Sequence, residues 1–269
     1  MKTLISIISL MGLLGLAMHQ PPHTCASVRK DETVVLLHGL ARSSKAMNKM
    51  ERKLAEAGYH VINHDYPSTT ATIEDLTNDV FQALEQRIKN ADTVHFVTHS
   101  MGGLILREHL EDNELPNLGR VVMLAPPSQG SEVADKLGNI FLYQWINGAA
   151  GNQLGTGTDS HPLRLKAPAF ELGIIAGDRT INPILSMLIP GADDGKVAVA
   201  RVKPERYDDY ILLHATHPMI VRNRTAIKQT IHFLKHGHFN RDENCTKTIA
   251  LNNRLYAQRG THPLRLQPF

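Results

Sequence analysis

Short apolar runs alternate with stretches of helical periodicity between residues 33 and 235, and this alternation constrains the fold more than any other feature of the chain. The runs that predict strands are residues 34–37, 59–63, 94–98, 121–125, 169–176, 197–202 and 211–213. The stretches that predict helices are residues 45–57, 73–88, 101–110 and 218–235. Strands that alternate with helices form a mostly parallel sheet with helices on both faces. We therefore expect an α/β protein whose ligands bind at the carboxyl ends of the strands.

The composition is that of one globular domain. The chain has 269 residues, of which 42% are hydrophobic and 20% are charged, and its formal net charge is +3. A chain of this length has room for a single α/β domain with a full core. Aromatic residues make up only 5%, and no block of lysine and arginine is interleaved with them, so we expect no nucleic-acid partner.

The first 26 residues predict a signal peptide or an N-terminal anchor. Lys2 precedes an uncharged run from residue 4 to residue 17, which is short for the roughly 20 residues of a membrane-spanning helix. Residues 15–17 and 24–26 are two candidate cleavage sites, but neither is a standard Ala-x-Ala. We therefore expect an exported protein, periplasmic or secreted, with attachment to a membrane through the N-terminal segment as the alternative.

The two cysteines and the C-terminal tail constrain the structure and function less than the features above. Cys25 and Cys245 are the only cysteines, and they can pair in an oxidising compartment only if cleavage leaves Cys25 in the mature chain. Residues 240–269 form a polar tail with weak periodicity that is either disordered or wraps around the body. The sequence does not determine the oligomeric state.

The stretch FVTHSMGGL places Ser100 where a predicted strand ends and a helix begins at once. A serine on such a sharp turn exposes its hydroxyl above the sheet, and the close passage from strand to helix requires small residues, here Gly102 and Gly103. The pattern is that of a G-x-S-x-G nucleophile elbow with one departure, because Thr98 stands where the first glycine is usual. Ser100 is our candidate nucleophile.

A nucleophilic serine needs a histidine as base and an acid to orient that histidine. In this kind of fold the order along the chain is serine, acid, histidine. This order excludes His38 and His99. We expect His99 to point away from the serine hydroxyl, either packing in the core or supporting a residue of the site. His217 is preferred to His214, since it follows the last strand and precedes Pro218, where a loop can direct an imidazole at the serine.

The acid has two candidates on the residues alone. Asp178 follows the predicted strand that ends at residue 176, and Asp194 lies in DDGKV, where Gly195 gives the turn freedom to present the side chain. Both positions are compatible with a carboxylate at the carboxyl edge of the sheet.

Several segments together resemble the bacterial lipase/esterase-type α/β-hydrolases. They are VVLLHGLARSS, THSMGG, LAPPSQGSEVAD, DDGKV and HATHPMIVRN, and the resemblance covers a hydrolase domain of residues 31–239. It implies the α/β-hydrolase fold with a short cap insertion, Asp194 as the acid and His217 as the base. It also implies an oxyanion hole made by the backbone N–H groups of Leu40 and Met101, whose side chains we expect at the acyl site.

The region between residues 128 and 168 is where substrate preference is expected. Phe141 and Trp145 stand beside a glycine-rich stretch, which suits a cap over an apolar acyl site, although the same residues could equally belong to an ordinary core helix. A cap of this kind, or the N-terminal segment, could also bring the protein to a membrane.

The resemblance implies a serine carboxylic-ester hydrolase, a lipase or esterase that passes through an acyl-serine intermediate on an acyl-ester or lipid substrate. No metal or organic cofactor is required, and His232 and His236 lack the acidic companion of a zinc helix. Two alternatives stay open: a lipase-like acyltransferase with the same three residues, and a non-catalytic binding protein of this fold. Nothing in the sequence separates hydrolysis from transfer.

Overall fold

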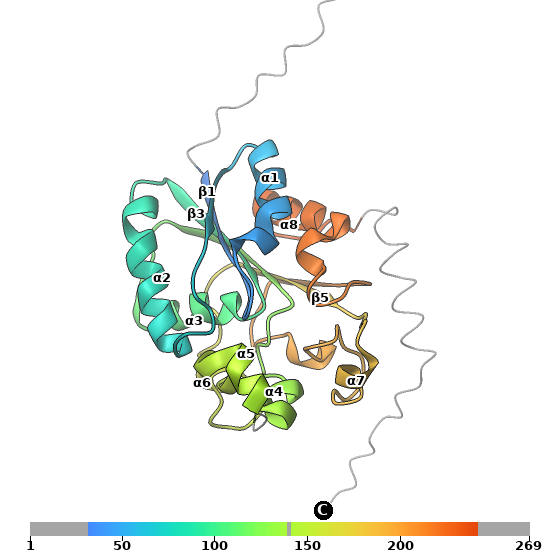
Figure 1. The fold of residues 1–269 in the computed structure, drawn as a ribbon. Helices are drawn as coiled ribbons and strands as arrows, with labels where there is room; N and C mark the ends of the chain where they lie inside the picture. Colours follow the sequence, from blue (N-terminus) through green and yellow to red (C-terminus); the bar gives the residue numbers. More distant parts are fainter. Residues whose placement is uncertain (1–31, 139–140, 242–269) are drawn as a thin grey trace, which may run out of the picture.

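Six parallel strands form one sheet at the centre of the molecule (Figure 1). The computed structural model describes residues 32–138 and 141–241. For residues 141–146 it describes the backbone but not the side chains. The expected signal peptide or anchor, both cysteines and nearly all of the polar tail lie outside the described residues. The strand order is β2-β1-β3-β4-β5-β6. The strands are β1 (Glu32–Leu37), β2 (His60–His64), β3 (Thr93–His99), β4 (Leu118–Leu124), β5 (Leu172–Gly177) and β6 (Asp209–Leu213).

Helices cover both faces of the sheet. Successive side chains of a strand point to opposite faces, and they belong to two separate cores, one on each face. Val35 and Leu37 of β1 belong to the core beneath α2 (Ile73–Ile88) and α3 (Gly102–Asp112). Val34 and Leu36 belong to the core beneath α1 (Asn48–Glu56) and α8 (Arg224–His236). A central strand that is buried on both faces therefore reads as a continuous apolar run in the sequence, as residues 34–37 do.

One predicted strand is wrong, and one predicted helix begins later than expected. Residues 197–202 form no strand: β5 pairs directly with β6, and this segment contains only an isolated bridge and the 3-10 turn η2 (Val199–Arg201). Val197 and Val202 are apolar because both are buried against the core. The last helix begins at Arg224, not at Pro218, because the side chain of Asn223 caps it by accepting from the N–H groups of residues 225 and 226.

The segment between β4 and β5 forms the cap expected from the sequence. It contains α4 (Glu132–Leu137), α5 (Phe141–Asn152) and α6 (His161–Arg164), and Figure 1 shows these helices gathered beyond one end of the sheet. The short helix α7 (Pro183–Ser186), which follows β5, lies beside them. Because the carboxyl ends of β3 and β6 lead toward this end, the cap lies over the edge where ligands of parallel sheets bind.

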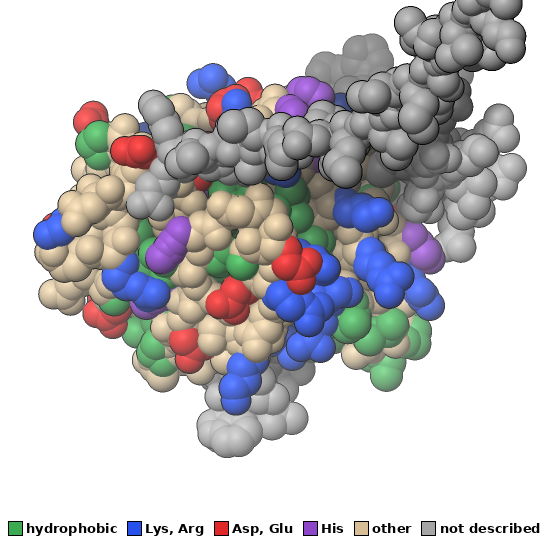
Figure 2. Space-filling view, turned by 90° about the horizontal axis from the view of Figure 1, so that it is seen from above, with side chains coloured by type: hydrophobic (Ala, Val, Ile, Leu, Met, Phe, Trp, Pro, Cys, Tyr) green, Lys and Arg blue, Asp and Glu red, His purple; other side chains and the backbone are tan. Residues whose placement is uncertain are grey.

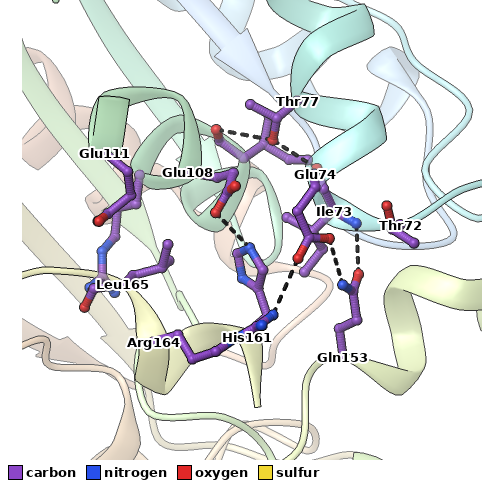
Figure 3. Close-up of polar contacts among 12 residues, drawn as sticks. Thr72, Ile73, Glu74, Thr77, Glu108, Glu111, Gln153, His161, Arg164 and Leu165 are labelled. Atoms are coloured by element: carbon purple, nitrogen blue, oxygen red, sulfur yellow. Dashed lines mark hydrogen bonds and ion pairs between the residues drawn. The ribbon is translucent and has the colours of Figure 1, made fainter. Parts of the chain in front are cut away.

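Polar contacts join the C-terminal part of the cap to α2 and α3 (Figure 3). His161, which is 2% exposed, donates its Nε2 hydrogen to Glu108 of α3 at 2.9 Å. Gln153 accepts from the N–H of Ile73 and donates to Glu74 of α2, each at 2.6 Å. Arg164 also pairs with Glu74, at 3.2 Å. These contacts fix this part of the cap to the body of the molecule.

The end of the molecule seen from above, away from the cap, is charged (Figure 2). Lysine and arginine side chains gather to the right of centre in this view, with aspartate and glutamate side chains among and beside them.

Within residues 32–138 and 141–241 no helix has the length and apolar character needed to cross a membrane.

Candidate active site

Ser100 lies on the sharp turn between β3 and α3 and has a left-handed backbone, with φ 52°. A residue other than glycine adopts this conformation only where the surrounding structure enforces it. The turn passes so close to β1 that a Cβ atom on Gly102 would lie 2.6 Å from the carbonyl oxygen of Leu37 and 2.7 Å from that of His38. Because Gly102 has no side chain, the strained turn can pack against the end of β1. The serine hydroxyl therefore lies at the edge of the sheet.

Thr98, which replaces the usual first glycine of the elbow, is fully buried. Its Oγ1 would lie 3.2 Å from a Cβ atom on Gly103, and within the described residues it has no hydrogen-bond partner. The absence of a side chain at Gly103 thus leaves the space that Thr98 occupies. The departure from the usual pattern is accommodated without any change in the strand-turn-helix geometry.

A chain of hydrogen bonds runs from Ser100 through His217 to Asp194. The Ser100 hydroxyl donates to His217 Nε2 at 2.9 Å, and His217 Nδ1 donates to Asp194 Oδ2 at 2.7 Å. All three residues are buried, Asp194 the most deeply at 1% exposure. The structure thus brings together the three side chains that the sequence singled out, although they come from three different loops.

The loop before η2 holds the Asp194 carboxylate in place. Its Oδ1 accepts from the backbone N–H groups of Lys196 at 3.0 Å and Val197 at 2.9 Å, so its other oxygen is left to His217. The backbone carbonyl of Asp194 also accepts from the N–H of His217 at 2.9 Å. Asp194 and His217 are therefore joined by two hydrogen bonds, one between their side chains and one between their main chains.

Asp178, the alternative acid, pairs with His214, the alternative base. Asp178 Oδ1 lies 2.9 Å from His214 Nδ1, and the His214 side chain is 54% exposed. His214 directly follows β6 and its side chain is exposed, and neither residue of this pair contacts Ser100. The geometry therefore separates two histidine–aspartate pairs, of which only His217 and Asp194 reach the serine.

His99 contacts His217, which agrees with one of the two roles expected for it from the sequence. It donates its Nε2 hydrogen to the backbone carbonyl of His217 at 3.0 Å, and the two ring centroids are 4.9 Å apart. Burial lowers the pKa of His99 well below its usual range, and the nearby His217 lowers it further, so the ring is neutral. His99 thus supports the loop that carries His217 from beneath.

Two backbone N–H groups near the serine have no acceptor. Those of Leu40 and Met101 form no hydrogen bond within the described residues. They belong to the turns that follow β1 and β3. Leu40 lines the cavity beside Ser100, but the Met101 side chain is fully buried in the core beneath α2 and α3, so the expectation that it lines the acyl site is wrong. The tight turn at Ser100 directs it into the core.

A cavity of about 370 Å³ opens beside Ser100 and His217, and the cap forms one wall of it. This volume lies at the lower end of the range for small-molecule sites. The cap contributes Ser131, Val133, Ala134, Leu137, Asn147 and Leu154. Arg42 and Lys196 also line the cavity, and among the described lining residues there is no aspartate or glutamate. Phe141 and Trp145, the expected substrate-binding residues, lie in α5, but their side chains are outside the described residues.

The described ranges contain no group of three or more histidine, cysteine, aspartate or glutamate side chains that could hold a metal ion. His232 and His236, which share a face of α8, pack with tilted rings whose centroids are 4.4 Å apart, and His238 packs against both.

A parallel sheet, a strained serine between β3 and α3 and a histidine after the last strand define the α/β-hydrolase fold. The chain belongs to the alpha/beta hydrolase family, whose sequence profile matches residues 34–242. No protein of curated function matches in a sequence comparison.

Solved structures of bacterial lipases and esterases share the fold. The mature form of a lipase from Bacillus licheniformis is 23% identical with a TM-score of 0.61, over 76% of this chain and 92% of that one. A phospholipase from Legionella pneumophila is 16% identical with a TM-score of 0.60, over 84% of this chain, which spans only 64% of that protein. A metagenomic carboxyl esterase is 18% identical with a TM-score of 0.57, over 76% and 71% of the two chains.

Proposed function

We propose that the protein is a serine hydrolase of carboxylic esters. The observation that carries the proposal is the chain of hydrogen bonds from Ser100 to His217 and Asp194, at 2.9 and 2.7 Å, beside a cavity of about 370 Å³. Nucleophile, base and orienting acid lie within hydrogen-bond reach of one another, as acyl transfer to a serine requires.

In the proposed mechanism, the Ser100 oxygen attacks the ester carbonyl while His217 Nε2 takes its proton. Asp194 holds the proton on Nδ1 of His217 and stabilises the imidazolium that forms. The negative charge that develops on the carbonyl oxygen is held by the N–H groups of Leu40 and Met101. His217 then gives its proton to the departing alcohol, which leaves an acyl-serine. Water, activated by the same histidine, releases the acid and restores Ser100.

The arrangement around the serine supports an ester substrate of modest size. Leu40, Val133, Leu137, Leu154 and Leu185 make the cavity wall largely apolar, as an acyl chain requires. The fold is shared with proteins described as a lipase, a phospholipase and a carboxyl esterase, which also suits an ester or lipid substrate.

Product analysis tests this proposal. Purified protein is incubated with 1-decanoylglycerol in water, with and without methanol as a competing alcohol, and Ser100→Ala is the control. We expect free decanoate as the main product in both mixtures and none with the Ser100→Ala variant. Predominant methyl ester would favour acyl transfer, and a lack of turnover by the folded protein would favour a binding function.

A further inference from the structure

The cavity beside Ser100 carries two cations that nothing in the proposed chemistry uses. Arg42 follows the Leu40 turn after β1, and Lys196 follows Asp194 by two residues, so they approach the cavity from opposite elements of the site. Within the described part of the chain, neither the Arg42 guanidinium nor the Lys196 ammonium has a hydrogen-bond or ion-pair partner.

Lys196 is held at a fixed place in this cavity. Its backbone N–H donates to Asp194 Oδ1 at 3.0 Å, and its carbonyl accepts from the hydroxyl of Ser131 at 2.6 Å. The residue is only partly exposed. Burial lowers the pKa of Lys196, the charge on Arg42 lowers it further, and the carboxylate of Asp194 opposes both. Two side chains of like charge thus line one cavity.

The positive charge of these two side chains extends to the depth of the reacting groups. The charges of Lys196 and Arg42 both reach this depth of the site, since each lowers the pKa of the buried His99 beside His217. The carboxylate that contacts the histidine, that of Asp194, is already occupied by His217 and by the backbone N–H groups of Lys196 and Val197. An anionic group of a bound substrate would give both cations a partner of opposite charge in this cavity.

We propose that Arg42 and Lys196 bind a phosphate or carboxylate group of the substrate, so that the preferred substrate is an ester with an anionic group close to the scissile bond. This inference rests on the proposed ester hydrolysis and names its substrate class. A guanidinium and an ammonium together are a donor set suited to either anion.

Three substrates with the same acyl chain test the preference: 1-decanoylglycerol, which is neutral, 1-decanoylglycerol 3-phosphate and 3-decanoylglycerate. The readout is kcat/KM for each anionic ester divided by kcat/KM for the neutral one, measured below the aggregation concentration. We expect the wild-type protein to prefer at least one anionic ester by about tenfold or more. Which anionic ester responds distinguishes a phosphate from a carboxylate.

Variants then assign the preference to the two cations. Lys196→Met and the exposed Arg42→Gln should each lower the ratio by about tenfold, and Lys196→Arg should largely keep it. Lys228→Met, which removes an exposed lysine on α8, is the matched control and should leave the ratio unchanged. No anionic preference in the wild-type protein, or an equal loss on neutral and anionic esters in the Lys196→Met and Arg42→Gln variants, would overturn the inference.

A binding measurement separates this inference from the proposed hydrolysis. Decyl phosphate and decanoate are titrated calorimetrically into the Ser100→Ala protein, alone and combined with Lys196→Met. Anion binding that weakens about tenfold with Lys196→Met supports the site even if no ester is hydrolysed. Equal affinity for both proteins, or no binding of either anion, would overturn it.

Discussion

His99 and His217 are joined by a hydrogen bond from the Nε2 of one to the backbone carbonyl of the other, at 3.0 Å. The donor lies directly before Ser100 in the chain, and the acceptor belongs to the residue that receives the serine proton in the proposed mechanism. A single buried ring therefore couples the turn that carries the nucleophile to the loop that carries the base.

We predict that His99→Phe lowers kcat by about 10- to 100-fold with little change in KM, because the loop of His217 loses its support and a small displacement of the base is costly. His99→Gln, whose amide can still donate, should recover much of the loss. The measurement is steady-state kinetics on a soluble ester together with urea unfolding. If His99→Phe lowers stability but leaves kcat unchanged, the contact serves packing alone.

Ser100 gives a prediction that separates function from stability. Both Ser100→Ala and Ser100→Gly should remove ester hydrolysis, since each lacks the hydroxyl. The left-handed backbone at φ 52° costs alanine about 1 kcal/mol that glycine does not lose. Ser100→Gly should therefore be the more stable of the two by about this amount in urea unfolding. Near-normal turnover by folded Ser100→Ala would show that the nucleophile is another residue.

Asp194 and Asp178 form a matched pair of carboxylates, each hydrogen-bonded to a histidine. Asp194→Asn should lower kcat by about three to four orders of magnitude, because an amide no longer fixes the His217 tautomer or stabilises its positive charge. Asp178→Asn should change kcat by less than about threefold, as its partner His214 is exposed and remote from Ser100. Steady-state kinetics on both variants checks the assignment, and the reverse order of effects would move the acid to Asp178.

Gly102 is predicted to be the glycine of the elbow that tolerates no side chain. Gly102→Ala places a methyl group 2.6 to 2.7 Å from two backbone carbonyl oxygens of the turn after β1, neither of which can move without distorting the sheet. We expect a loss of about 2–4 kcal/mol in the free energy of unfolding. Gly157→Ala, at a position with open space around it, should change that free energy by no more than about 0.5 kcal/mol. Similar values for the two variants would contradict the close approach.

The lowered pKa values of buried histidines predict how the free energy of unfolding depends on pH. Burial lowers the pKa of His38, His95 and His99, so each binds a proton more readily in the unfolded chain than in the fold. Their contribution to stability is present above the ordinary histidine pKa of about 6.5 and is lost as the pH falls below it. Each such group costs about 1.4 kcal/mol per pH unit in that window.

Urea unfolding at pH 7.5, 6.5 and 5.5 measures this dependence. We expect the free energy of unfolding to change little between pH 7.5 and 6.5 and to fall between 6.5 and 5.5. His95→Gln should make the fall shallower, since it removes one titrating group. A free energy that is constant down to pH 5.5 would mean that the buried histidines are protonated in the fold as easily as outside it.

The sequence alone determined the layered architecture. Local periodicity is set by side chains that follow one another in the chain, so the helix at residues 73–88 was predicted with the bounds that it has, and the runs of β1, β3 and β4 were placed within a few residues. The position of Ser100 followed in the same way, because a strand that meets a helix at a serine and two glycines is a local pattern.

Prediction from local sequence patterns failed where the same residue types are compatible with two kinds of secondary structure. In residues 197–202, Val197, Ala198 and Val202 are apolar and buried against the core. Because β5 pairs directly with β6, the segment has no place between them and forms a bridge and a turn in place of a strand. The start of the last helix was misplaced because a proline can open a helix, but Asn223 provides the cap that fixes it.

The tertiary structure decided which distant residues meet. The residues alone left Asp178 and Asp194 equally open, and only the packing of the loops after β5 and β6 directs His217 toward Asp194 and His214 toward Asp178. The same holds for Arg42 and Lys196, which no local pattern relates and which the fold places around one cavity. Such contacts depend on how helices and strands far apart in the chain pack against one another, and that information is spread over the whole core.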